Sequence, residues 1–170
     1  MAIRFLTNSE DTIEVVVTCD SEVIASEEQR AKYLELADLD ALESIGRGAT
    51  IFKLKALSPS EREEAEIRAG ALQRSELGRM LWGEAPSDFA ERARWHHELS
   101  NDEREAMAQY NAYLSRVYTE MIRASLVSID GESASVEQLD SIRPDSQRLQ
   151  VISELVLHIQ RISLLGIEGK

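Results

Sequence analysis

The hydrophobic pattern of this chain changes after Leu57, from a period of two residues to a period of 3.6. Before that point, segments 12–18 and 50–57 are rich in β-branched and aromatic residues and alternate along most of their length, which is typical of strands. From residue 58 onward, apolar residues recur at helical spacing almost to the end of the chain. The sequence therefore predicts a predominantly helical α+β fold with a small N-terminal β unit of two or three strands.

The N-terminal β unit is expected to span residues 1–57. Arg4–Leu6 can pair with the 12–18 strand across a polar turn, and a helix is expected to be inserted between the strands, over residues 26–45. Ser26 and Gln29 have the spacing of a capping box, and Gly46 and Gly48 turn the chain into the next strand. The remaining residues, 58–170, are expected to form a second part, a bundle of about four or five helices.

Helix starts in the second part are marked by capping signals. Ser58-Pro59-Ser60-Glu61 combines a capping serine, a proline in the first turn and a glutamate that reaches back to the cap. The helical pattern predicts one helix from this point to about Trp82, and Asp130–Gly131 is interpreted as the end of a later long helix. The other expected helices are 88–98, a long one from Ser100, a short one from Ser135 that stops before Pro144, and 145–165. Trp82 and Trp95 are expected in the core.

The charge of the chain restricts its partners. It has 31 acidic and 19 basic residues, a formal net charge of −12 and a pI near 4.7. Nucleic-acid binding requires clustered Lys and Arg, and no basic run is present, so direct binding to DNA or RNA is not expected. The apolar stretches are too short for a membrane helix, the N-terminus does not resemble a signal peptide, and Cys19 is the sole cysteine. These features predict a cytoplasmic protein that does not bind membranes.

The residues with chemical potential do not form a recognisable catalytic, cofactor-binding or metal-binding motif. His96 and His97 are adjacent, so their side chains diverge by about 100° on a helix and cannot form a zinc-protease pair. Gly46-Arg47-Gly48 leads into a strand and has too few glycines for a phosphate-binding loop. The sequence predicts that the chain is not an enzyme and needs no cofactor, and that it works by binding another protein.

The order of elements resembles that of the tail assembly chaperones of long-tailed bacteriophages. The resemblance rests on the strand 49–57 followed at once by the helix start 58–64, on the later segment 117–131 and on the closing segment 154–165. The helical insertion 26–44 departs from the family order. The chain also lacks the run of acidic residues that is frequent in the family after the final Ser–Leu pair.

This resemblance implies a binding function that involves no catalysis. Such chaperones bind the long, largely helical tape measure protein in the cytoplasm of the host cell and keep it soluble during tail assembly. For this chain, the resemblance implies a tape measure or other tail protein as the partner, captured as a helix in a groove. The candidate partner-binding residues lie on the apolar face and tail of the last helix, and are Leu155, Ile159, Ile162, Leu164, Leu165 and Ile167. The competing interpretation is that the helix residues among them form the bundle core.

Two other functions fit the sequence. A structural virion protein of the neck, connector or tail would form a homo-oligomeric ring through a large apolar interface. A small acidic inhibitor of a host nucleic-acid-binding enzyme would use its negative surface as a mimic of nucleic acid.

Overall fold

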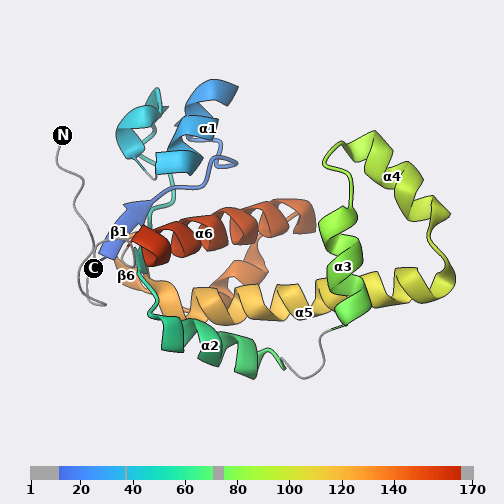
Figure 1. Cartoon of the computed structure of the whole chain (residues 1–170). Coiled ribbons are helices and arrows are strands. Elements are labelled where there is room, and N and C mark those ends of the chain that lie inside the picture. Colours follow the sequence, from blue (N-terminus) through green and yellow to red (C-terminus); the bar gives the residue numbers. More distant parts are fainter. Residues whose placement is uncertain (1–11, 37, 71–74, 166–170) are drawn as a thin grey trace. The chain divides into compact units, whose positions relative to one another are not determined.

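The computed structural model describes residues 12–36, 38–70 and 75–165 (Figure 1). The described helices are α1 (Glu27–Leu36), α2 (Pro59–Arg68), α3 (Glu76–Glu84), α4 (Phe89–Glu98), α5 (Asn101–Ser125) and α6 (Asp145–Leu165), with the 3₁₀ helices η1 (Leu39–Ala41) and η3 (Val136–Ser141). The described strands are β1 (Thr12–Val15), β2 (Val23–Ile24), β3 (Ser44–Ile45), β4 (Phe52–Lys55), β5 (Leu126–Ile129) and β6 (Glu132–Ser133). The predicted fold class, α+β and predominantly helical, is confirmed.

Tertiary contacts divide the chain into two compact units. Unit 1 comprises Met1–Glu63 and Met121–Lys170, and unit 2 comprises Glu64–Glu120. The sequence placed the division between residues 57 and 58 instead. The difference arises because α6, from the end of the chain, packs against β4 and α1 of the N-terminal part.

The main sheet of unit 1 is antiparallel, with the strand order β1-β4-β5-β6. β4 pairs with β1 so that Val15 lies opposite Phe52, and with β5 so that Phe52 lies opposite Ile129. β5 and β6 form a hairpin whose turn is Asp130–Gly131, with φ angles of 51° and 80°. These positive φ angles are those that a tight hairpin turn requires, and Asp and Gly tolerate them.

Two predicted elements need correction, and one lies outside the described residues. The long helix ends at Ser125 rather than at Asp130–Gly131, because the chain then enters β5 and the Asp-Gly pair is a hairpin turn. The single helix predicted from residue 58 to Trp82 is two helices, α2 and α3. Gly70, with a φ of 87°, follows the end of α2, and Ser75 caps α3 by accepting a hydrogen bond from the Gly78 amide. The predicted strand Arg4–Leu6 lies outside the described residues.

The predicted capping boxes are present with both of their hydrogen bonds. The Ser58 amide donates to Glu61 Oε2 at 2.8 Å, and the Glu61 amide donates to Ser58 Oγ at 3.2 Å. The same reciprocal pairs join Ser26 with Gln29, and Ser100 with Glu103. Each box satisfies backbone donors that the first turn of a helix leaves without intrahelical partners.

The inserted segment between β1 and β4 has an apolar core of its own. Tyr33 of α1 is fully buried there, and its hydroxyl donates to the Val16 carbonyl at 2.8 Å and accepts from the Val16 amide at 2.9 Å. The buried residues packed with Tyr33 are Val16, Val23, Leu42 and Ala49. The phenol therefore completes the hydrogen bonding of the backbone just where β1 ends.

Polar side chains fasten α6 to the strands of unit 1. The Glu154 carboxylate is buried and accepts from the Thr18 amide at 2.6 Å and from Thr18 Oγ1 at 2.8 Å. Two residues before the end of α6, Ser163 Oγ accepts from the Leu57 amide at 2.9 Å. These bonds satisfy backbone donors beyond the ends of β1 and β4, which burial would otherwise leave unpaired.

Replacing Thr18 with valine is expected to lower the free energy of unfolding by about 2 kcal/mol, since the shape is kept and one hydrogen bond to a buried carboxylate is lost. Thr119→Val is the matched control, because the Thr119 hydroxyl donates to the Ser115 carbonyl of its own helix in a hydrogen bond that is exposed to solvent. Its effect is expected to stay within about 0.5 kcal/mol. Urea denaturation followed by circular dichroism measures both values. Equal losses in the two variants would contradict the role of the Thr18–Glu154 contact.

Unit 2 is built on the crossing of α3 over the first part of α5 (Figure 1). Gly78 is the point of closest approach: a Cβ atom placed there would overlap the Ala106 carbonyl oxygen and come within 2.7 Å of Tyr110 Cβ. Leu81, Leu99 and Met107 form a small buried cluster beside this crossing, and Trp95 packs against it. The absence of a side chain at residue 78 therefore sets the distance between the two helices.

Candidate protein-binding surface and pocket

The predicted partner-binding residues of α6 are mostly core residues. Leu155 and Ile159 have no exposed surface, and Ile162 is 3% exposed. Leu164 is 52% exposed near the end of the helix. Leu165 is the last residue of α6, and neither its side chain nor Ile167 belongs to the part that the structure describes. The apolar face of α6 that was predicted to bind a partner is thus packed inside unit 1. Of the predicted residues whose side chains are described, Leu164 alone is exposed.

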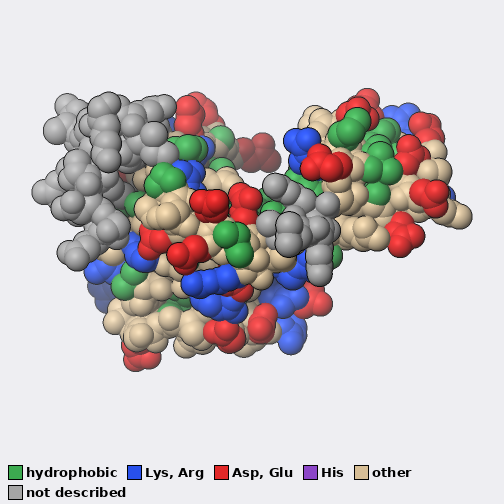
Figure 2. Space-filling model, turned by 60° about the horizontal axis from the view of Figure 1, so that its bottom comes forward, with side chains coloured by type: hydrophobic (Ala, Val, Ile, Leu, Met, Phe, Trp, Pro, Cys, Tyr) green, Lys and Arg blue, Asp and Glu red, His purple; other side chains and the backbone are tan. Residues whose placement is uncertain are grey.

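Exposed apolar side chains gather instead on α3 of unit 2. Leu77 is 43% exposed, Met80 is 58% exposed and Trp82 is 45% exposed, within six consecutive residues. We call Leu77 and Met80 the α3 surface. Leu77 and Met80 are three residues apart and share one side of the helix. In the space-filling view, hydrophobic side chains reach the surface on the right, where α3 and α4 lie, among acidic ones (Figure 2).

Trp82 lies on the other flank of the buried stripe that Gly78 and Leu81 form. Its ring stands 6.4 Å from the ring of Tyr110, measured between centroids, so the indole is held against α5 while almost half of its surface remains exposed. Trp95, in contrast, is partly buried against the core cluster of unit 2. Of the two tryptophans expected in the core, only Trp95 packs there.

The periodicity of the sequence could not identify the α3 surface. In the helix predicted from residue 58 to Trp82, Leu77, Met80 and Leu81 fall near one side, and the pattern predicts that this side points inward because all three residues are large and apolar. The buried positions of α3 are Gly78 and Leu81. A glycine carries no hydrophobic signal, so nothing in the pattern indicated that the helix turns its smallest residue toward α5.

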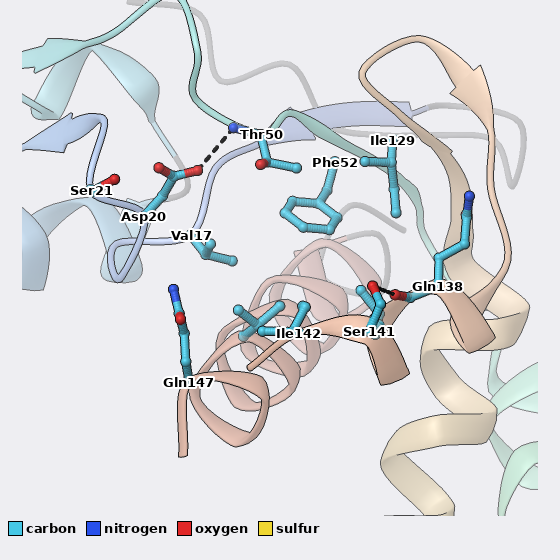
Figure 3. Close-up of a pocket in the computed structure, with 12 residues that line it drawn as sticks. Val17, Asp20, Ser21, Thr50, Phe52, Ile129, Gln138, Ser141, Ile142 and Gln147 are labelled. Carbon is cyan, nitrogen blue, oxygen red and sulfur yellow. Dashed lines mark hydrogen bonds between the residues drawn. The ribbon is translucent and has the colours of Figure 1, made fainter. Parts of the chain in front are cut away.

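Unit 1 contains an open pocket with a volume of about 360 Å³ (Figure 3). It lies between the sheet, η3 and the first turns of α6. Its apolar lining residues are Val17, Phe52, Ile129, Leu139, Ile142 and Val151, and its polar lining residues are Asp20, Ser21, Thr50, Gln138, Ser141 and Gln147. Polar residues lie at both ends of the pocket, with apolar residues between them (Figure 3). Such a combination of apolar walls and a few polar groups is typical of small-ligand sites.

Asp20 supplies the charge in this pocket. Its Oδ2 accepts from the Thr50 amide at 2.9 Å and its Oδ1 accepts from the Glu22 amide at 2.9 Å. Both carboxylate oxygens are therefore held in place by backbone donors, and each keeps a further lone pair. None of the twelve lining residues is Lys, Arg or His.

His158, which is fully buried, and Cys19, which is half-buried, are two further groups in unit 1 with chemical potential. His158 is fully buried beside the Tyr33 ring at 5.1 Å, and neither of its ring nitrogens has a hydrogen-bond partner among the described residues. Burial, together with the positive charge of Arg161, lowers the pKa of His158 to about 4. Burial and the nearby Glu154 carboxylate raise the pKa of the Cys19 thiol. The imidazole and the thiol are thus neutral at pH 7, which suits structural roles rather than a nucleophilic site.

The remaining histidines and the acidic residues form no cation site in the described ranges, where no three His, Cys, Asp or Glu side chains are grouped closely enough to hold a metal ion. No helix in the described part of the chain has the length and apolarity needed to cross a bilayer.

A scan against protein-family models and searches of curated proteins and of solved structures each gave no match. The functional proposals rest on the α3 surface and the unit 1 pocket.

Proposed function

We propose that this chain is a non-catalytic protein-binding module that captures an apolar helical segment of its partner on the α3 surface. Its specific form is a tail assembly chaperone of a long-tailed bacteriophage, which holds the tape measure protein in solution until the tail tube assembles. The observation that supports this proposal is the exposure of Leu77 and Met80 on one side of a short helix.

The energetics of burial support α3 as the contact. Covering a large apolar side chain contributes roughly 1.5–3 kcal/mol when it passes from full exposure to burial, and less for side chains that begin half-buried. Such contacts contribute to a reversible complex, although they do not by themselves offset the cost of association.

The charge of the chain supports the chaperone form of the proposal. A net charge of −12 makes copies of the protein repel one another, and it keeps a complex dissolved while the apolar stripe of the partner is covered. An uncovered apolar stripe on a long helical protein would otherwise promote aggregation.

The test is co-expression with the longest helical protein encoded beside this one, followed by affinity capture and light scattering. The double substitution Leu77→Asp and Met80→Asp is expected to weaken the complex at least tenfold, since it places two charges in a dry contact. Leu149→Asp is the matched control, because Leu149 is 56% exposed on α6 of unit 1 and should leave binding unchanged. All three positions are exposed, so folding should be retained.

Each alternative predicts a different result in the same experiment. If the purified chain alone forms a closed ring and does not associate with the partner in co-expression, the chaperone function is rejected and a structural virion protein is favoured. Salt-sensitive binding to a DNA-binding enzyme, unaffected by the α3 substitutions, would favour the acidic inhibitor.

A further inference from the structure

We propose that the pocket of unit 1 binds a small organic cation, namely an ammonium group attached to an apolar body about the size of a phenyl ring. This site is separate from the α3 surface and does not depend on the function proposed above. The argument rests on the size of the pocket, on the sign of its charge and on the arrangement of its uncharged polar groups.

The size of the pocket suits a ring but not a large cofactor. Its volume of about 360 Å³ lies near the lower end of the range of roughly 300–1,000 Å³ found for ligand sites. Phe52, Val17 and Val151 are all buried and supply an apolar wall. A phenyl-sized group placed against this wall would exchange contact with water for contact with hydrocarbon, which favours binding.

The charge of the pocket selects a cation. Asp20 is the charged residue in the lining, and no Lys or Arg lines the pocket to neutralise it. An anionic ligand would therefore be repelled, whereas an ammonium group would be attracted. Because the Thr50 and Glu22 amides hold the two carboxylate oxygens in place, little conformational freedom is lost when Asp20 accepts a hydrogen bond from the ligand.

The other polar groups can complete the shell of an ammonium group. An ammonium donates three hydrogen bonds, of which Asp20 can accept one or two. Gln147, from the first turn of α6, points into the pocket toward Asp20 and Val17 (Figure 3). Its side-chain oxygen can accept a further bond, as can the Ser21 hydroxyl at the same end of the pocket. The polar end of the ligand would thus lie by Asp20 and its apolar body against Phe52.

A titration with three related compounds tests this proposal. 2-Phenylethylamine, 2-phenylethanol and 3-phenylpropionate share the ring and differ in charge, and each is added to the ¹⁵N-labelled full chain at pH 7. The amine is expected to shift the amide resonances of Ser21, Thr50 and Gln147, and to bind at least tenfold more tightly than the alcohol. The carboxylate is expected not to bind. Equal affinity for amine and alcohol, or shifts confined to other residues, would overturn the proposal.

Two variants separate pocket binding from general attraction to an acidic protein. Asp20→Asn should remove the preference for the amine, whereas Asp40→Asn, which deletes the same charge at an exposed position outside this pocket, should leave it unchanged. Ser141→Trp should fill the pocket from its exposed rim and abolish amine binding, and it keeps the test valid if Asp20→Asn does not fold. Unchanged amine binding in Ser141→Trp would place the ligand elsewhere and reject the site.

A lysine side chain of a protein also carries an ammonium group on an apolar chain. A second titration distinguishes such a side chain from a free aromatic amine. Nα-acetyl-lysine amide carries the ammonium on a thin alkyl chain that fills less of the pocket. Tighter binding of phenylethylamine assigns the site to a free aromatic amine. Tighter binding of the lysine derivative assigns it to a basic side chain of a protein.

Discussion

Replacing Gly78 with alanine is expected to destabilise unit 2 by about 3 kcal/mol or more, because the new methyl group has no space. Its nearest neighbours would be the carbonyl oxygen of Ala106 and Tyr110 Cβ, and backbone atoms cannot move aside as the end of a flexible side chain can. Helices α3 and α5 would have to separate, which would expose the cluster of Leu81, Leu99 and Met107.

Tryptophan fluorescence measures this effect selectively, since the chain has two tryptophans and both lie in unit 2. Gly83→Ala is the matched control within the same helix, because nothing lies within 4 Å of a Cβ at that position. It should stabilise α3 by about 0.5–1 kcal/mol through the higher helix propensity of alanine. A Gly78→Ala protein whose fluorescence transition matches that of the original chain would show that the close crossing is absent.

Acidification is expected to remove about 3 kcal/mol of the stability of unit 1 between pH 6.5 and pH 4, through His158. Burial lowers the pKa of His158 from 6.5 to about 4 in the folded protein. In that interval the unfolded chain binds a proton that the folded chain does not, so the free energy of unfolding falls as the pH falls. The loss is complete once the pH is below the folded pKa.

His158→Phe is expected to remove this pH dependence. Phenylalanine keeps a ring beside Tyr33 and does not titrate, and it replaces two ring nitrogens that have no hydrogen-bond partner among the described residues. The variant should also be more stable than the original chain at pH 7, because no polar group is left unpaired. Urea denaturation at pH 7.0, 6.0 and 5.0 gives the comparison. A decline of equal size in both proteins would assign the pH dependence to other groups.

Carboxylates whose pKa is lowered in the folded protein change the free energy of unfolding at lower pH than His158 does. Partial burial opposes ionisation of Glu61, but the hydrogen bonds from Lys55 and Ser58 outweigh it and lower its pKa. Hydrogen bonds from Ser100 lower the pKa of Glu103. A group of this kind stabilises the fold above its unfolded pKa and loses that contribution as the pH falls through its folded pKa. These two residues therefore contribute to the decline below about pH 4.5, which leaves the interval from 6.5 to 5 to His158.

The extent to which the candidate sites could be predicted differs between their parts. Trp82 stood out in the sequence as an aromatic residue next to a helix break, yet its exposure depends on the position of Gly78 against α5. The pocket could not be predicted, because Val17, Phe52, Gln138 and Gln147 come from four separate segments. Their proximity results from the docking of η3 and α6 on the sheet, and no spacing in the sequence encodes it.

Local sequence determined the elements whose signals lie within a few residues of one another. Helix α6 was predicted with its observed bounds, and the boxes at Ser26, Ser58 and Ser100 mark helix starts, because a cap and its partner are three residues apart. The β5–β6 hairpin also carried a local signal, since Asp130–Gly131 between two short segments favours a tight turn. That signal was misread as a helix end, because the helical pattern of α5 runs directly into β5.

Tertiary structure decided which apolar surfaces are covered. Leu155 and Ile159 on the one hand, and Leu77 and Met80 on the other, fit the same helical pattern of large apolar residues. The first pair is buried by the elements of unit 1, and the second remains exposed because Gly78 takes the contact with α5. Periodicity records only that a helix has an apolar side, whereas burial depends on the shape of a neighbour that is distant in sequence.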